Sequence, residues 1–293
     1  MKIDAHQHFW DPSRKDYGWI DDLQGEAARR LRRPILPPEL APLLTAEQVD
    51  STVLVQAAPS DAEGQFLLSL ADRHAFIAGV VVWVDMEAPD FEERLGALRS
   101  RAKFVGVRPM IHDISDASWM LRRNVQQAFA ALERQQICFD FLVRPVHFPP
   151  LLEILAAFPR LRAVLDHIGK PQIGARQWEP WATLLERAAR SPNLYCKLSG
   201  MVTEANHSTW APADLAPYVR HALQCFGSER CMFGSDWPVC TLAASYSQVT
   251  GALTQTLAPL ALGAAEQKRI WGGTAAAFYR LSGEPVPPAR EVS

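Results

Sequence analysis

The sequence predicts an α/β fold, a TIM (β/α)8 barrel that forms a single domain. Eight apolar segments rich in Val, Ile and Leu recur about every 25–35 residues, as repeated strand–helix units would. Most are continuous apolar runs, which is typical of parallel strands buried on both faces. A helical pattern follows each segment after the first, and eight such units fit the usual size of this barrel, about 250 residues.

An open, doubly wound sheet is the alternative for a chain in which strands and helices alternate. Its dinucleotide-binding form carries a GxGxxG turn after a strand, and no such turn follows any expected strand here. We therefore prefer the barrel, over residues 1–282. Residues 283–293 are expected to form a disordered tail, because they are rich in proline.

Each strand is assigned from its apolar run, which gives residues 2–10, 52–56, 77–85, 104–108, 137–144, 163–167, 193–199 and 230–236. The helices are expected at residues 61–74, 90–101, 120–136, 149–158, 177–190 and 213–226, with two more in 244–281. The fourth of them begins with two prolines, which the first turn of a helix accepts. The loop after the first strand is too long for a simple turn. Its aromatic residues Trp10, Tyr17 and Trp19 favour an ordered lid or a pocket wall.

The composition is that of an ordinary globular protein, with 48% apolar residues, 21% charged residues and a formal net charge of −2. This balance predicts no nucleic-acid surface and no membrane patch, and no apolar run is long enough to span a bilayer. We therefore expect a small-molecule partner. The first strand begins at residue 2, which leaves no room for a signal peptide and predicts a cytoplasmic protein. The five cysteines include no CxxC pair and are expected to be free thiols.

Polar side chains stand at the ends of the apolar strands. In a TIM barrel the active site is built at the carboxyl ends of the strands. The first strand offers His6 and His8, two residues apart and therefore on one face. The later strands end in Gln56, Trp83, Asp85, Arg108, Asp140, Arg144, Asp166, His167, Lys197, Asp236 and Trp237. Because buried polar groups are costly unless paired or used, this repeated pattern predicts a functional site.

Structural roles are the alternative for several of these residues. His167 could be a core histidine bonded to a backbone carbonyl, and Lys197 and Arg108 could neutralise Asp140 or Asp166. Asp166 follows the alternation opposite to His167, so we expect its side chain to pack against the helix layer.

Three motifs resemble the amidohydrolase superfamily: Asp4-Ala5-His6-Gln7-His8, Leu165-Asp166-His167-Ile168-Gly169-Lys170-Pro171 and Phe233-Gly234-Ser235-Asp236-Trp237-Pro238. Four others are similar to its sugar-lactonase branch, which includes the L-fuconolactonases and L-rhamnonolactonases. They are His8-Phe9-Trp10-Asp11, Tyr17-x-Trp19, Gly106-Val107-Arg108 and Lys197-Leu198-Ser199-Gly200. The resemblance covers residues 2–281.

The resemblance implies hydrolysis of a sugar lactone, such as L-fucono-1,5-lactone, to its aldonic acid. Asp236 would be the general base, and His167, Lys197 or Arg108 would hold the developing oxyanion. The expected substrate contacts are Trp10, Trp19, Gln56, Trp83, Arg144 and Trp237.

A single divalent metal ion is the expected cofactor, with His6, His8, His167 and Asp236 as ligands. Nitrogen and oxygen ligands of this kind suit zinc or manganese, and we expect zinc. Binuclear members of the superfamily use a carboxylated lysine at the end of strand 4. The residue of this chain that resembles it in position is Arg108. We therefore expect one ion rather than two, and a lactone is activated enough that catalysis need not depend on it.

Two other reactions and one non-enzymatic role stay open at this point. Arg108, Arg144 and Lys197 would also suit a dicarboxylate lactone of the muconolactone type. Metal-dependent decarboxylases resemble this barrel too, but usually carry a glutamate in the first-strand motif where Asp4 stands. A binding barrel that has lost catalysis is disfavoured, because all four expected metal ligands are present.

Overall fold

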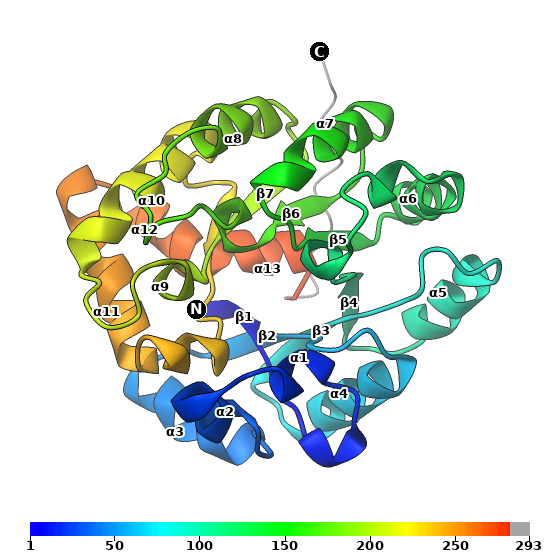
Figure 1. The fold of residues 1–293 in the computed structure, drawn as a ribbon, viewed down its shortest axis with the longest axis horizontal. Helices are drawn as coiled ribbons and strands as arrows, with labels where there is room; N and C mark the ends of the chain where they lie inside the picture. Colours follow the sequence, from blue (N-terminus) through cyan, green and yellow to red (C-terminus); the bar gives the residue numbers. More distant parts are fainter. Residues whose placement is uncertain (282–293) are drawn as a thin grey trace.

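The computed structural model describes residues 1–281 and confirms the TIM barrel (Figure 1). Eight parallel strands pair in chain order: β1 (Ile3–Gln7), β2 (Ser51–Val55), β3 (Ile77–Val82), β4 (Phe104–Val107), β5 (Cys138–Phe141), β6 (Ala163–Leu165), β7 (Leu194–Leu198) and β8 (Cys231–Phe233). Most strands are shorter than expected. Many of the polar residues assigned to strand ends therefore lie in the first residues of the loops, where they are free to depart from strand alternation.

Backbone hydrogen bonds join the last strand to the first and bring the two ends of the barrel wall together. The amide of Asp236 donates to the carbonyl of His6 at 2.8 Å, and the amide of His8 donates to the carbonyl of Trp237 at 2.7 Å. Asp236 thus follows β8 directly beside the two histidines of the β1 segment, although 228 residues separate it from His8.

Helices follow the strands around the outside of the barrel: α4 (Asp61–Arg73), α5 (Phe91–Arg99), α6 (Arg123–Gln135), α7 (Phe148–Ala157), α8 (Trp181–Ala189), α10 (Pro212–Phe226) and α11 (Tyr246–Leu257). The last helix, α13 (Thr274–Tyr279), is placed differently. The region 244–281 contains three helices rather than two, because a π turn at Arg269–Gly273 separates α12 (Ala264–Lys268) from α13. The long first loop is ordered, as expected, and holds α1 (Gly18–Asp21), α2 (Gly25–Leu31) and α3 (Pro37–Ala46). A short helix, α9 (Met201–Glu204), follows β7.

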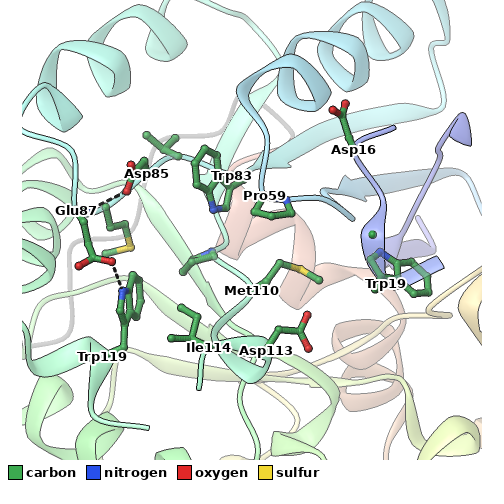
Figure 2. A pocket seen from close by; sticks show the side chains of 14 residues that line it. Asp16, Trp19, Pro59, Trp83, Asp85, Glu87, Met110, Asp113, Ile114 and Trp119 are labelled. Atoms are coloured by element: carbon green, nitrogen blue, oxygen red, sulfur yellow. Dashed lines mark hydrogen bonds between the residues drawn. The ribbon is translucent and has the colours of Figure 1, made fainter. Parts of the chain in front are cut away.

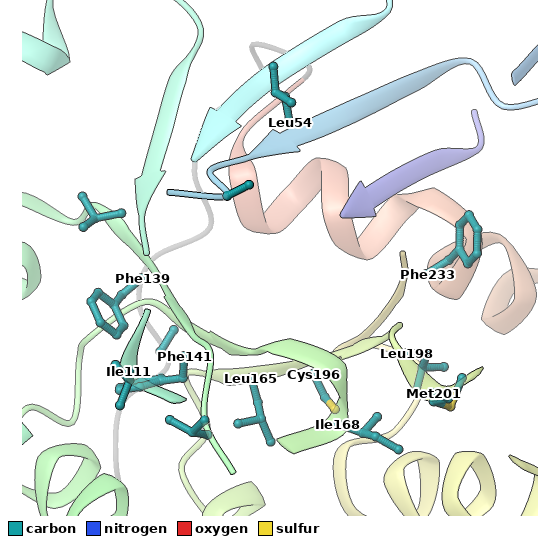
Figure 3. Packing of buried hydrophobic residues seen from close by; sticks show 14 of the residues in the cluster. Leu54, Ile111, Phe139, Phe141, Leu165, Ile168, Cys196, Leu198, Met201 and Phe233 are labelled. Atoms are coloured by element: carbon teal, nitrogen blue, oxygen red, sulfur yellow. The ribbon is translucent and has the colours of Figure 1, made fainter. Parts of the chain in front are cut away.

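Strand alternation divides the buried side chains into two cores. On β7, Cys196 and Leu198 face outward into the core between strands and helices, which Figure 3 shows. Tyr195 and Lys197, on the opposite face, point into the barrel. The interior core packs against α13, which lies across the barrel opposite the site and contributes Phe278 and Tyr279 (Figure 1).

Other expectations concern the chain as a whole. All five cysteines are free thiols, as expected. Among residues 1–281, no helix combines the length and the apolar character needed to cross a membrane. The tail expected to be disordered, residues 283–293, lies outside the described residues.

Candidate active site

A cavity of about 200 Å³ opens at the carboxyl ends of the strands. Five of the residues expected at the site border it: His8, Trp19, Arg108, His167 and Asp236. The rest of the lining comes mainly from loops after the strands and includes Ala57, Met110, His112, Asp113, Leu142, Lys170, Thr203 and Val239. Part of the expected set of residues is thus gathered around one cavity.

Three histidines surround the carboxylate of Asp236. Its Oδ1 atom lies 3.3 Å from Nε2 of His8, 3.8 Å from Nε2 of His6 and 3.9 Å from Nε2 of His167. The Nε2 atoms of His6 and His8 are themselves 3.2 Å apart. Asp236 adopts a left-handed backbone conformation, with φ of 59°, which turns the chain sharply after β8. The four residues expected as metal ligands are therefore neighbours.

Hydrogen bonds at the other ring nitrogen orient two of these imidazoles. His8 donates from Nδ1 to the carbonyl of Val55 at 2.8 Å, which leaves its Nε2 lone pair directed at the cluster. His167 contacts the Ser199 hydroxyl through Nδ1 at 2.9 Å. The ring nitrogens that face Asp236 are thus the ones free to bind a proton, water or an ion.

Two glycines from the quoted motifs allow these side chains to approach the strands so closely. A Cβ atom on Gly200 would lie 2.5 Å from Nδ1 of His167, and Gly200 also has a φ of 62°. A Cβ atom on Gly234 would lie 2.7 Å from Cβ of His6. Both distances are far inside van der Waals contact, so these positions require glycine for packing reasons.

A buried layer of charges lies beneath the cluster. Lys197 contacts Asp140 at 2.6 Å, Asp166 at 3.0 Å and Nδ1 of His6 at 3.1 Å, and its side chain has no exposed surface. The hydroxyl of Tyr279, from α13, donates to Asp140 at 2.7 Å. Lys197 therefore does not border the cavity, and its position is that of a support beneath His6 rather than of a group that meets substrate.

Our expectation that Asp166 packs against the helices is wrong. Its Oδ2 accepts a hydrogen bond from Arg108 at 3.1 Å, and its Oδ1 lies 3.4 Å from Nδ1 of His6. Asp166 continues the inward face of Val164, whereas His167 and Ile168 take positive φ values of 53° and 47°. This left-handed turn breaks the alternation that we assumed, so both Asp166 and His167 point inward.

Burial and neighbouring charges act in opposite directions on the pKa values of His167 and Asp236. Burial lowers the pKa of His167 to about 3, so this imidazole is neutral near pH 7. Burial alone would raise the pKa of Asp236, but His167, His8 and His6 outweigh it and hold that pKa below its ordinary value. The cavity therefore presents an ionised carboxylate beside a neutral imidazole.

Four of the expected substrate contacts border neither this cavity nor the larger one beside it. Trp10 is fully buried and donates to the carbonyl of Leu31, and Trp237 is buried against Phe9. Arg144 is exposed outside both cavities. The last of the four, Gln56, is also buried, and its amide donates to the carbonyl of Arg108 at 2.7 Å.

Gln56 instead supports the guanidinium of Arg108, which donates back to the carbonyl of Gln56. Sequence reasoning missed His112 and Lys170, which do border the cavity. His112 follows strand 4 by a few residues, and Lys170 follows strand 6 in the same way. Extending the survey of strand ends into the loops would have found them, and Lys170 already stood in a quoted motif.

The sequence model of the protein family described as Amidohydrolase matches residues 3–281 of this chain. The chain belongs to the amidohydrolase family. It is 37% identical over 284 residues to the L-fucono-1,5-lactonase of Burkholderia ambifaria, with 96% of each chain covered. It is 38% identical over 294 residues to the L-fucono-1,5-lactonase of Burkholderia multivorans, again with 96% of each covered. It is also similar to a crystal structure of an amidohydrolase from Burkholderia multivorans with bound zinc, with 36% identity and a TM-score of 0.88. That match covers 96% of this chain and 99% of the other.

The donor set of this amidohydrolase fits one divalent ion. His6, His167 and Asp236 each offer a ligand atom, and these atoms all lie within 4.8 Å of one another. The ligand atoms of a tetrahedral zinc ion, with bonds of about 2.0–2.1 Å, stand roughly 3.3 Å apart. His8 meets that spacing with His6 at 3.2 Å and with Asp236 at 3.3 Å. His6, His167 and Asp236 are thus close enough together to hold one ion, and His8 lies beside two of them.

Proposed function

We propose that this amidohydrolase hydrolyses a sugar lactone to its aldonic acid, with an L-fucono-1,5-lactone-like substrate as the first candidate. The observation that carries the proposal is the ionised carboxylate of Asp236 beside the neutral imidazole of His167 in the lining of one cavity. The L-fucono-1,5-lactonases that resemble the chain over almost its whole length support this choice.

Asp236 acts as the general base in this mechanism. A water molecule attacks the lactone carbonyl carbon and transfers a proton to the Asp236 carboxylate, so that a tetrahedral oxyanion forms. When that intermediate collapses, the bond from the carbonyl carbon to the ring oxygen breaks, and the protonated Asp236 returns the proton to the leaving oxygen. One carboxylate thus serves both steps, and a positioned base of this kind contributes about 10²–10⁴ in rate.

Arg108 is the group best placed to stabilise the oxyanion. Its side chain borders the cavity, and its guanidinium is held in place by Asp166 and by the carbonyl of Gln56. His167 lines the same cavity and orients the attacking water through Nε2. Lys197, which we expected to share the oxyanion, instead fixes the position of His6 from below.

His6, His8, His167 and Asp236 would hold a divalent ion, zinc by our expectation. Such an ion lowers the pKa of a bound water toward neutrality when present. The ligand set has a test that does not use turnover. Equilibrium dialysis against zinc should show one ion per chain, and Asp236→Asn should weaken that binding. If no ion binds at millimolar zinc, the ligand assignment is wrong and the histidines are substrate contacts.

Two of the three cations that we expected to bind a dicarboxylate lactone do not face the cavity, because Arg144 lies outside it and Lys197 is enclosed by two carboxylates. Arg108 and Lys170 do border it, so the neutral sugar lactone is preferred on the likeness to the L-fucono-1,5-lactonases. Asp4 stands where decarboxylases usually carry a glutamate. Its carboxylate is buried and accepts hydrogen bonds from the backbone and hydroxyl of Ser235 and from the hydroxyl of Tyr246. Asp4 therefore fastens β1 to the loop after β8 and offers nothing to the cavity.

A pH-indicator assay on fucono-, galactono-, rhamnono- and arabinono-lactones tests the proposal. We expect acid release from at least one, and a loss of two or more orders of magnitude in turnover for Asp236→Asn, from the loss of its base. Circular dichroism would confirm that the variant is folded. Acid release from none of the lactones, by protein that converts another substrate, would contradict the proposal.

A further inference from the structure

A second and larger cavity adjoins the proposed catalytic cavity. Its volume is about 430 Å³, and its walls come from the first loop and from the segments after β2, β3 and β4 (Figure 2). The two cavities share three lining residues, Trp19, Met110 and Asp113. We call them the inner and the outer cavity. The shared wall makes the outer cavity the natural place for any part of a substrate that extends beyond the inner one.

The two cavities differ in charge. The inner cavity contains Arg108, Lys170 and three histidines, which suit the carboxylate of the product. The outer cavity has acidic residues in its lining and, within the described chain, no lysine, arginine or histidine. An anionic group is therefore excluded from the outer cavity by charge repulsion.

Three tryptophans, Trp19, Trp83 and Trp119, line the outer cavity. Figure 2 shows Trp83 on one side of the space, with Trp119 and Ile114 facing it from the other side. The indole of Trp119 is held by a hydrogen bond to Glu87 at 2.8 Å, and that of Trp19 by one to the carbonyl of Ala57 at 2.7 Å. These rings are therefore fixed before any ligand arrives, which lowers the entropic cost of binding.

The indole N–H of Trp83 is the exception, since no acceptor for it is found in the described part of the chain. In Figure 2 this nitrogen points toward the open space. A cation offers no lone pair to such a donor, so an ammonium group would leave it unsatisfied. The hydroxyl groups of a sugar can accept a hydrogen bond from Trp83 and can donate to the carboxylate of Asp85, whose Oδ1 caps the amide of Glu87 at 2.9 Å.

We propose that the outer cavity is a second subsite that binds a neutral sugar ring linked to the lactone in the inner cavity. The preferred substrate is then a glycosylated aldonolactone. Its lactone carbonyl lies at Asp236, and its glycosidic link passes the shared wall at Trp19 and Met110. The second ring lies against Trp83 and undergoes no bond change. This inference rests on the proposed lactonase activity for its chemistry, but its location and its ligand class come from the outer cavity alone.

The test compares matched lactones on the wild-type protein. Maltobiono- and lactobiono-1,5-lactone carry a neutral second ring, glucono-1,5-lactone carries none, and a glucuronyl-linked lactone carries an anionic one. We expect kcat/KM for the neutral disaccharide lactones to exceed that for glucono-1,5-lactone by about tenfold or more, as stacking and hydrogen bonding in a shaped pocket provide. The glucuronyl compound should show no such gain.

Trp83→Ala should lower the ratio of disaccharide to monosaccharide kcat/KM about tenfold, and Trp83→Phe should lower it less, because it keeps an aromatic face without the N–H donor. Trp178→Ala is the matched control, since Trp178 is an exposed tryptophan outside both cavities. Its ratio should equal that of the wild type.

Hydrolysis of glucono-1,5-lactone without a disaccharide preference, or with a preference that survives Trp83→Ala, would overturn the second subsite and leave the lactonase proposal intact. If no lactone is hydrolysed, the lactonase proposal fails, and calorimetric titration with maltose decides the subsite separately. Maltose binding that Trp83→Ala weakens would support the subsite, and no detectable binding of maltose by the wild type would overturn it.

Discussion

Gly200→Ala gives the sharpest test of how the site is built. Gly200 follows β7, and an added Cβ would lie 2.5 Å from Nδ1 and 2.6 Å from Cγ of His167. Ordinary contact begins near 3.4 Å, so the ring has to move by about 0.9 Å, and a misplacement of about 1 Å can cost 10²-fold in rate. The same movement would break the 2.9 Å contact between His167 and the Ser199 hydroxyl.

The substitution should also reduce the free energy of unfolding. An alanine at the φ of 62° found at Gly200 costs about 1–2 kcal/mol, and overpacking a filled core adds about 1–3 kcal/mol. Gly227→Ala is the control for backbone strain without a clash. Gly227 has a φ of 67° and a ψ of 170°, compared with 62° and 6° at Gly200, and nothing lies within 4 Å of its added Cβ.

Lactone hydrolysis and urea unfolding are measured for both variants. We expect Gly200→Ala to lose about two orders of magnitude in kcat/KM, and Gly227→Ala to lose stability while keeping its activity. Wild-type activity in Gly200→Ala would refute the reasoning, because His167 would then tolerate displacement. Equal loss of activity in both variants would also refute it, since backbone strain alone would explain the effect.

Three further predictions concern two buried charged side chains and the bound ion. Lys197→Met should cost about 3–5 kcal/mol of unfolding free energy, because it leaves Asp140 without a cationic partner, whereas Asp166 keeps Arg108; adding Asp140→Asn should recover part of this, as urea titration would reveal. Burial raises the pKa of Glu63 to about 8 in the folded state. Protonation of this side chain therefore contributes stability that is fully present below the ordinary pKa of a glutamate, and this contribution is lost as the pH rises through 8. Between pH 5 and 8 the wild type should therefore lose about 1–4 kcal/mol relative to Glu63→Gln, and parallel profiles would show that Glu63 titrates normally. Chelator treatment should remove the bound ion but leave part of the lactonase activity; complete loss, restored by stoichiometric zinc, would show that catalysis requires the metal.

The sequence was sufficient for the barrel and for the residues that meet at its carboxyl end, because both follow from a simple pattern. Apolar runs at regular spacing predict the strands, and a polar residue after each run predicts the site. The depth of a side chain within the barrel does not follow from this pattern. Lys197 and Asp236 both follow apolar runs, but Lys197 lies one layer below the cavity, where it pairs with Asp140, and Asp236 faces the cavity.

The remaining differences arise where the backbone leaves the strand conformation. His167 and Ile168 both have positive φ, although neither is glycine, and no local sequence signal announces that turn. The tryptophans show a similar limit. Trp10 and Trp19 lie nine residues apart in the same loop, but only Trp19 borders a cavity, since the fold of α1 and α2 over the barrel decides which ring is covered.

The charges around His6 explain why one ion suits this site better than two. Arg108 stands where binuclear relatives of the superfamily carry a modified lysine, and its Nη1 lies 3.3 Å from Nε2 of His6. Lys197 lies on the other side of the same ring, 3.1 Å from Nδ1. Asp140 and Asp166 balance these two permanent positive charges within the buried layer, so neither carboxylate is available to a second cation. Only the face of the cluster toward Asp236 and His8 is left for a cation, and this face lies on the side of the proposed substrate cavity.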